Sequence, residues 1–194
     1  MKKIAYKFPG TIFLVIGNSG SGKDSIINGV IKKYPSHLKQ IHAPKRFITR
    51  PPSETEKNIS ITEEKFKDLK EKGKLALTWH IYGLYYGIPI EIEDWLKAGN
   101  PILLNVSRRV VKPAREKYKN LKVVFIYVPL EITIDRLKGR GRETTELLQE
   151  RIERAKNNQL YSGADLVIDN SGKLDDSINQ LLEFIISIVS ENHK

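Results

Sequence analysis

The sequence predicts a three-layer α/β fold with a mostly parallel central sheet. Two observations lead to this prediction. Short apolar runs rich in β-branched residues alternate along the chain with longer segments whose apolar residues recur at helical spacing. The short runs are continuous rather than alternating, which is typical of strands buried on both faces. Strands are predicted at residues 11 to 17, 45 to 50, 74 to 80, 101 to 107, 122 to 128 and 166 to 170.

Helices are predicted between these strands and after the last one. Thr62 begins one helix, because its hydroxyl can cap the first turn and Glu63 and Glu64 follow at the positive end of the helix dipole. Gly99 ends another, since glycine readily adopts the left-handed conformation that closes a helix. The helical segments are residues 23 to 34, 63 to 71, 91 to 98, 108 to 118, 130 to 138, 146 to 157 and 174 to 189.

Length and composition indicate one globular domain with small insertions. The chain has 194 residues, of which 40% are hydrophobic and 29% charged, and we find no repeat. No run approaches the roughly 20 apolar residues of a membrane span, so no membrane partner is expected. The N-terminal segment runs directly into the first strand, which argues against a cleaved leader. With Cys at 0 there is no disulfide framework, and a cytoplasmic location is expected.

The formal net charge of +10 raises the question of nucleic-acid binding. The lysines are scattered over predicted helical surfaces, as in residues 65 to 74, and no aromatic-spaced basic stripe or nucleic-acid motif accompanies them. We therefore expect no nucleic-acid partner, and the positive potential suits a small polyphosphate ligand. No exposed apolar helix face is evident in the pattern, so the sequence makes no prediction of oligomeric state.

One stretch carries a recognisable phosphate-binding pattern, GNSGSGKDS. Its glycines and lysine fit the spacing G-x-x-x-x-G-K, and it lies between a predicted strand and a predicted helix. In such a loop the backbone N–H groups and the helix N-terminus face the phosphates, while the lysine reaches the phosphate that is transferred. The motif predicts ATP binding by Gly17, Asn18, Ser19, Gly20, Ser21, Gly22, Lys23, Asp24 and Ser25.

The residue after Lys23 departs from this pattern. The usual loop has a serine or threonine there, whose hydroxyl binds the Mg²⁺ held by the phosphates. Here Asp24 occupies that position and Ser25 follows it. Either Ser25 supplies the hydroxyl one residue later, or Asp24 holds the metal through a bound water. A third interpretation makes Asp24 only a first-turn acid that stabilises the helix dipole.

Further segments resemble the guanylate kinase family, over roughly residues 11 to 170. They are the loop, FITR (47 to 50), GLYYG (83 to 87), RLKGRGRE (136 to 143) and RIERA (151 to 155). The resemblance implies a P-loop kinase fold with an acceptor-binding insertion at about 45 to 95 and a lid at about 139 to 150. It implies that Arg50 and Tyr86 bind the acceptor's phosphate and that lid arginines close over the transferring group.

The residues that read guanine in that family are absent. The positions that carry a serine, a glutamate, a second serine and an aspartate in guanylate kinases are Arg46, Leu77, Ile88 and Ser107 here. Leucine and isoleucine cannot accept hydrogen bonds from guanine, so GMP is not the expected substrate. Arg46 lies four residues before Arg50 in a predicted strand, which would place both side chains on one face and favour a polyanionic ligand.

The altered pattern resembles one branch of the family, the ribose 1,5-bisphosphate phosphokinases. The segments GNSGSGKDS, RFITR, LTWHIYGLYYGIPIEIEDWLKAG, LLNVSR and GRGRE carry this resemblance. It implies that ATP phosphorylates ribose 1,5-bisphosphate, a phosphorylated sugar, to 5-phosphoribosyl 1-diphosphate, as in phosphonate breakdown. Two alternatives stay open: a guanylate kinase-like nucleoside monophosphate kinase, and a P-loop module that is non-catalytic or binds nucleic-acid ends.

The resemblance assigns roles to individual residues. Lys23, Arg140, Arg142 and Arg151 would act on the transferring group, and Asn170 lies near where relatives contact adenine. The acceptor residues would be Arg46, Arg50, His80, Tyr86, Asn105, Ser107 and Arg108. For His80 a purely structural role competes with hydrogen bonding to the sugar or its phosphate.

Overall fold

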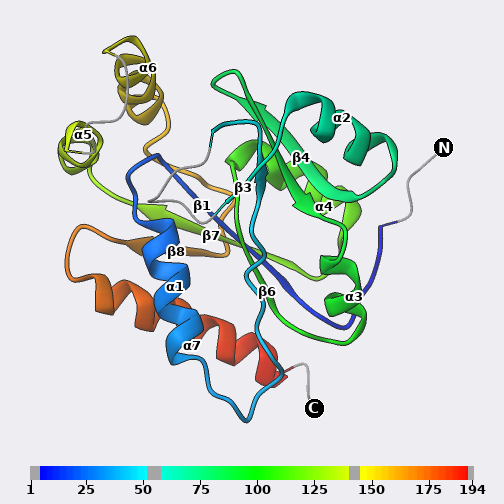
Figure 1. Ribbon diagram of the computed structural model, residues 1–194. Coiled ribbons are helices and arrows are strands. Elements are labelled where there is room, and N and C mark those ends of the chain that lie inside the picture. Colours follow the sequence, from blue (N-terminus) through cyan, green and yellow to red (C-terminus); the bar gives the residue numbers. More distant parts are fainter. Residues whose placement is uncertain (1–4, 52–57, 140–144, 192–194) are drawn as a thin grey trace. The chain divides into compact units, whose positions relative to one another are not determined.

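The structure is a computed structural model that describes residues 5 to 51, 58 to 139 and 145 to 191. The chain forms two compact units. The first unit comprises Met1–Ile12 and Lys39–Leu121, and the second comprises Phe13–Leu38 and Lys122–Lys194. Figure 1 labels their helices and strands. Within the described ranges, no helix has the length and apolar character that crossing a membrane requires.

The second unit contains parallel strands of the predicted central sheet. Strand β7 lies between β1 and β8, and it pairs with β8 in parallel, with Val124 opposite Leu166. The side chains of β1 are fully buried from Ile12 to Ile16, as predicted for a strand covered on both faces. Helix α7 packs beside α1 (Figure 1). The elements are β1 (Ile12–Gly17), α1 (Lys23–Lys33), β7 (Leu121–Tyr127), α5 (Leu130–Lys138), α6 (Thr145–Lys156), β8 (Leu166–Asp169) and α7 (Leu174–Glu191).

The first unit contains a separate four-stranded sheet in the order β3-β2-β5-β4. Strands β4 and β5 form an antiparallel hairpin, and β2 pairs antiparallel with β5 and parallel with β3. The elements are β2 (Phe47–Ile48), β3 (Ile59–Ser60), α2 (Glu63–Glu71), β4 (Leu75–Ile81), β5 (Leu84–Pro89), α3 (Ile92–Lys97), β6 (Ile102–Asn105), the short 3-10 helix η1 (Arg108–Val110) and α4 (Val111–Lys117).

Two predicted strands behave differently from the others. The segment predicted as a strand at 45 to 50 contributes only the two residues of β2, and the segment at 74 to 80 becomes β4; both belong to the mostly antiparallel sheet. Their cross-strand partner β5 is absent from the prediction. Apolar runs alone do not identify their partners, because pairing depends on register with a distant segment.

The predicted helix ends are confirmed where side-chain or backbone geometry defines them. Thr62 caps α2, and its Oγ1 accepts a hydrogen bond from the Lys65 N–H at 3.2 Å. Gly99 has a φ of 83°, the left-handed conformation expected directly after a helix. The helix predicted at 108 to 118 begins instead as η1, where Ser107 Oγ accepts from the Arg109 N–H.

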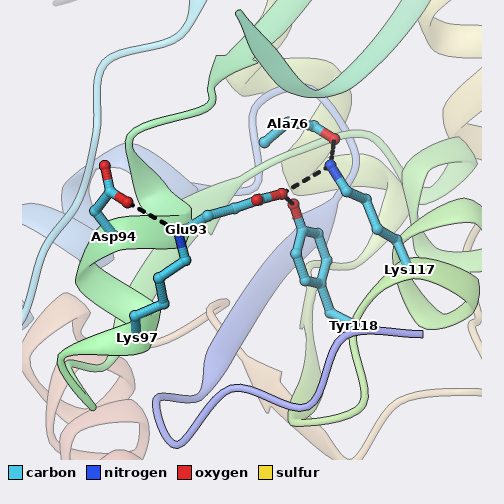
Figure 2. A network of polar contacts seen from close by, with 6 residues as sticks. All are labelled: Ala76, Glu93, Asp94, Lys97, Lys117 and Tyr118. Atoms are coloured by element: carbon cyan, nitrogen blue, oxygen red, sulfur yellow. Dashed lines mark hydrogen bonds and ion pairs between the residues drawn. The ribbon is translucent and has the colours of Figure 1, made fainter. Parts of the chain in front are cut away.

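A network of polar contacts joins α3, the end of α4 and β4 within the first unit (Figure 2). Glu93 Oε1 accepts hydrogen bonds from Tyr118 Oη and from Lys117 Nζ, both at 2.9 Å. Lys117 Nζ also donates to the Ala76 carbonyl at 3.0 Å. Burial, and then the bond to the Glu93 carboxylate, raises the pKa of the Tyr118 hydroxyl well above its usual range. The Tyr118 hydroxyl therefore stays protonated and donates its hydrogen bond to Glu93.

A stacked pair of rings holds the segment before β2 against α3. The His42 imidazole stacks on the Trp95 indole with 4.3 Å between ring centroids and 3° between planes. The Asn100 amide nitrogen lies 3.1 Å from His42 Nε2, and since an amide N–H can only donate, this ring nitrogen accepts. Burial also lowers the pKa of the His42 imidazole. The hydrogen bond from Asn100 and the burial of the ring both favour the neutral imidazole.

We expect this pair to make the protein less stable in mild acid. A histidine whose folded pKa lies below its unfolded value of about 6.5 contributes stability above that pH and loses it as the pH falls through the folded pKa. Urea unfolding at pH 7.5 and pH 5.0 should therefore show a larger loss of unfolding free energy in the wild type than in His42→Gln. Equal losses in the two proteins would contradict the prediction.

Candidate active site

The loop from Gly17 to Ser25 connects β1 to α1 in the second unit. Gly22 stands at the N-cap of α1 in the left-handed conformation, with a φ of 87°, and provides no side-chain cap. A Cβ on Gly22 would lie 2.4 Å from Asn170 Nδ2, and a Cβ on Gly17 would lie 2.6 Å from the Ile126 carbonyl oxygen. These positions therefore require glycine, and the loop keeps the first N–H groups of α1 open to an anion.

Lys23 lies along the loop. Its Nζ donates to the carbonyl oxygens of Gly17 at 3.0 Å and Asn18 at 2.8 Å, and lies 3.4 Å from Ser21 Oγ. The ammonium group is thus held against the loop by backbone oxygens. This arrangement suits a nucleoside triphosphate, because the Lys23 ammonium group and the backbone N–H groups at the start of α1 lie within one short segment.

Asp24 and Ser25, the two candidates for organising Mg²⁺, occupy the first turn of α1, and both are exposed. Among the described residues, no group of three or more histidine, cysteine, aspartate or glutamate side chains could hold a metal ion. Mg²⁺ commonly binds through one or two protein oxygens together with substrate phosphates and waters. Either side chain can supply such an oxygen, so the residues present fit the metal.

Two arginines of the second unit contact the loop region. Arg151 of α6 donates from Nη1 to Ser19 Oγ at 3.1 Å, so the structure places this predicted catalytic residue at the phosphate loop. Arg136 of α5, the first residue of the segment RLKGRGRE and not among the predicted site residues, donates from Nη2 to the Asn170 carbonyl at 3.0 Å. The other two predicted catalytic arginines, Arg140 and Arg142, lie outside the described residues.

Asn170, which the family resemblance places near the adenine of ATP, forms a hydrogen bond with the phosphate loop. Its side-chain N–H donates to the Ser21 carbonyl at 2.8 Å, and its Oδ1 accepts from Ser177 Oγ at 2.9 Å. These three residues are almost completely buried, with exposed fractions of 3% for Asn170, 0% for Ser21 and 1% for Ser177. These two buried hydrogen bonds fix the position of the loop, because a displaced Ser21 or Asn170 would leave a buried polar group without its hydrogen bond.

Ser177 was missed by the sequence prediction, although a signal existed. It occupies the same helical stripe as Leu181 and Ile185, at spacings of four and eight residues, and those side chains are buried. A small polar residue on an apolar stripe is typically hydrogen-bonded. That pattern could have flagged Ser177, but its partner at Asn170 could not be read from the pattern.

In the first unit, Arg46 is joined to the end of β6. Its Nη1 donates to the Asn105 carbonyl at 3.1 Å, and its Nε donates to Asn58 Oδ1 at 3.2 Å. The structure therefore brings together two predicted acceptor residues that are 59 positions apart. Asn58 was missed, and no motif or periodicity in the sequence singles it out.

Arg50 and Tyr86 lie at the neighbouring strands β2 and β5. Tyr86 pairs with Ile48, two residues before Arg50, and the Arg50 carbonyl accepts a hydrogen bond from Ser60 Oγ. The Tyr86 ring stacks on Trp79 with 5.1 Å between centroids and 6° between planes. Tyr86 thus lies in β5, where the aromatic stack restrains its ring, whereas Arg50 follows the end of β2 by two residues. Arg46 precedes β2, so the two arginines do not share the strand face that the sequence predicted.

The remaining acceptor candidates lie along β4 and the segment after β6. The His80 ring is exposed and packs against Tyr85 at 4.5 Å between centroids, and the His80 carbonyl accepts from Arg109 Nη1 at 3.2 Å. Ser107 caps η1 and Arg108 is its first residue. These contacts link the β4-β5 hairpin to the loop that carries Ser107 and Arg108.

Leu77 and Ile88 are direct cross-strand partners in β4 and β5. They occupy two of the positions at which guanylate kinases carry residues that bind guanine. Their exposed fractions are 6% and 0%. These two adjacent, buried apolar side chains form part of the hydrophobic core of this sheet. Neither can supply a hydrogen-bond acceptor to a base.

Comparison with known proteins places the chain among kinases. The guanylate kinase family model matches residues 10–188. The chain therefore belongs to the guanylate kinase family. Its fold resembles that of guanylate kinase from Anaplasma phagocytophilum, with a TM-score of 0.70 at 18% identity over 94% of this chain and 88% of that one. A sugar kinase from Janibacter sp. HTCC2649 also shares the fold, with a TM-score of 0.53 at 18% identity over 91% and 95% of the chains.

Curated relatives at higher identity carry a more particular name, Ribose 1,5-bisphosphate phosphokinase PhnN. The relative from Pseudomonas paraeruginosa is 34% identical over 91% of this chain and 95% of its own length. That from Rhodopseudomonas palustris is 34% identical over 91% and 89%, and that from Pseudofrankia inefficax is 37% identical over 92% of both chains.

Proposed function

We propose that this protein uses ATP to phosphorylate ribose 1,5-bisphosphate, giving 5-phosphoribosyl 1-diphosphate and ADP. The observation that carries the proposal is the similarity to the phosphokinases just named, at 34 to 37% identity over nearly the whole of both chains. The Leu77–Ile88 pair supports it, because these two buried apolar positions offer none of the polar groups that recognition of a base requires.

In this proposal the second unit binds the donor. The loop from Gly17 to Ser25 holds the phosphates of ATP through backbone N–H groups, and Lys23 and Arg151 neutralise charge on the transferring phosphoryl group. Arg140 and Arg142 are assigned the same role from the sequence. Ser25, or Asp24 through a water, would hold Mg²⁺, which would neutralise further charge on the phosphates of ATP.

The first unit binds the acceptor. Arg50 and Tyr86 bind a phosphate of the sugar, and Arg46 adds a second guanidinium whose orientation is fixed by Asn58 and the Asn105 carbonyl. The residues Ser107, Asn105, Arg108 and His80 complete the proposed acceptor set. Guanidinium groups suit this ligand because their N–H donors match phosphate oxygens in pairs.

The chemistry follows from the acceptor. An oxygen of the 1-phosphate attacks the γ-phosphorus of ATP, the bond from that phosphorus to the β–γ bridging oxygen breaks, and ADP leaves with the bonding electrons. The attacking oxygen is already anionic at neutral pH, so no side chain has to remove a proton from it. The residues of this chain therefore act by orienting the groups and neutralising their charge.

The alternatives receive less support. A guanylate kinase-like nucleoside monophosphate kinase would need polar side chains that hydrogen-bond to the base at the positions of Leu77 and Ile88. A non-catalytic or nucleic-acid-end-binding module would have no need for Lys23 at the loop and Arg151 beside it. We place the reaction in the cytoplasm, as the sequence predicted.

An acceptor panel tests the proposal. Purified protein with ATP and Mg²⁺ is assayed for coupled ADP release with ribose 1,5-bisphosphate, GMP and the other nucleoside monophosphates, and the product is identified by mass spectrometry. We expect turnover on the sugar bisphosphate alone. Turnover on GMP would mean that the assignment of Arg46, Leu77, Ile88 and Ser107 is wrong, and the absence of turnover on every acceptor would favour the binding module.

A further inference from the structure

Helix α6 is attached to the phosphate loop by two consecutive loop residues. Arg151 Nη1 donates to Ser19 Oγ at 3.1 Å. Next to it, the side-chain amide of Asn18 donates to the Asn158 carbonyl at 3.1 Å and approaches the Ala155 carbonyl at 3.4 Å. Arg151 and Ala155 are four residues apart and so lie on one face of the helix. That face meets the loop.

The end of α6 has its own local hydrogen bonds as well. Gln159 Nε2 donates to the Ala155 carbonyl at 2.7 Å, and Asn158 Nδ2 donates to the Arg154 carbonyl at 2.7 Å. The last carbonyls of a helix need such partners because no further turn follows. The Ala155 carbonyl therefore has a local donor without Asn18. What Asn18 adds is a connection between the helix end and a loop 137 to 140 residues earlier.

We infer that Asn18 is a positioning residue that fixes the C-terminal end of α6 to the phosphate loop and thereby sets the place of Arg151. The inference rests on the proposed function only in taking Arg151 as a group that acts on the transferring phosphate. A long arginine side chain has many rotamers, so the position of its guanidinium group depends on where its backbone is held. A misplacement of about 1 Å can lower a rate by about a hundredfold.

A double-mutant cycle tests whether Asn18 acts through Arg151. We expect Asn18→Ala to lower kcat on ribose 1,5-bisphosphate about tenfold, while the dissociation constant of the ATP analogue AMP-PNP, measured by calorimetry, changes less than about twofold. The loop's backbone N–H groups stay in place, which is why binding should persist. In an Arg151→Ala background, Asn18→Ala should cause no further fall in kcat. Independent, multiplying effects would overturn the inference.

Gln159→Ala is the matched control. It removes a shorter hydrogen bond to the same Ala155 carbonyl but leaves the connection to the loop intact. We expect it to lower the thermal midpoint slightly and to leave kcat within about twofold of the wild type. If Gln159→Ala lowered kcat as much as Asn18→Ala, general weakening of α6 would explain the effect and the positioning role would be refuted.

Hydrogen exchange tests the connection without turnover, so it separates this inference from the proposed function. In Asn18→Ala, backbone amides at residues 155 to 158 should exchange faster than in the wild type, since the attachment to the loop is lost. Unchanged exchange there would overturn the inference, even in an active enzyme. If the wild type phosphorylates no acceptor but Asn18→Ala speeds this exchange, the proposed function fails while the attachment stands.

Discussion

Replacing Lys23 by alanine is expected to lower kcat/KM for the proposed reaction by about a thousandfold or more. Removing one preorganised charged or hydrogen-bonding group at a developing transition-state charge costs about a hundred- to a thousandfold, and here the group lost is a full positive charge at the phosphate loop. In the structure Lys23 Nζ is fixed within hydrogen-bonding distance of the Gly17 and Asn18 carbonyls. Steady-state ADP release with ATP, Mg²⁺ and ribose 1,5-bisphosphate measures the effect.

Lys33 on the same helix provides the control. Its Nζ forms an ion pair with Asp175 Oδ1 at 2.7 Å, and both side chains are exposed. Lys33→Ala removes an equal charge from α1 but lies at the opposite end of the helix from the loop, so kcat/KM should stay within about twofold and stability should change by less than about 1 kcal/mol. A Lys23→Ala enzyme that kept a tenth of its activity would contradict the assignment of Lys23.

Replacing Glu93 by alanine is expected to lower the free energy of unfolding by about 3 kcal/mol. Breaking a buried ion pair costs about 3–5 kcal/mol because the remaining charge loses its partner. The side chains of Lys117 and Glu93 keep exposed fractions of 29% and 16%, so solvent relieves part of that cost. The Tyr118 hydroxyl also loses its acceptor, in a residue only 2% exposed. Urea unfolding at pH 7.5 measures the change.

Two variants bracket this result. Glu93→Gln retains an oxygen for Tyr118 but removes the charge facing Lys117, so it should cost less than Glu93→Ala. Asp94→Ala removes the neighbouring carboxylate, which pairs with Lys97 at 3.1 Å between side chains that are 76% and 60% exposed (Figure 2). An exposed pair contributes about 0–1 kcal/mol, so Asp94→Ala should be nearly neutral. Equal costs for Glu93→Ala and Asp94→Ala would show that the network adds no stability.

Prediction succeeded where the signal lies in neighbouring residues. The strands that become β1, β7 and β8 were recognised because they are continuous apolar runs, and α2 has the predicted bounds with its capping Thr62. Prediction failed for β5. Its residues include a glycine and a proline, which are uncommon in strands, and its pairing with β4 depends on a two-residue turn.

That turn illustrates what local preference could not supply. Tyr82 and Gly83 have φ values of 54° and 69°, the pattern of a type I′ hairpin turn, in which asparagine and glycine are preferred. A tyrosine at the first of these positions is unfavourable by itself. The register of the flanking strands, with Ile81 opposite Leu84, imposes this conformation. Tertiary packing therefore overrode local preference in forming the hairpin that carries His80 and Tyr86.

The sequence by itself determined the phosphate loop and the position of Lys23, because nine consecutive residues between a strand and a helix define that structure locally. Only the tertiary structure decided that Arg46 meets the Asn105 carbonyl, that Arg151 meets Ser19, and that Asn170 supports Ser21; these pairs are 59, 132 and 149 residues apart. Periodicity and residue preference act over a few residues. Contacts at such separations depend instead on how packed strands and helices place distant backbone segments, and no local pattern encodes that placement.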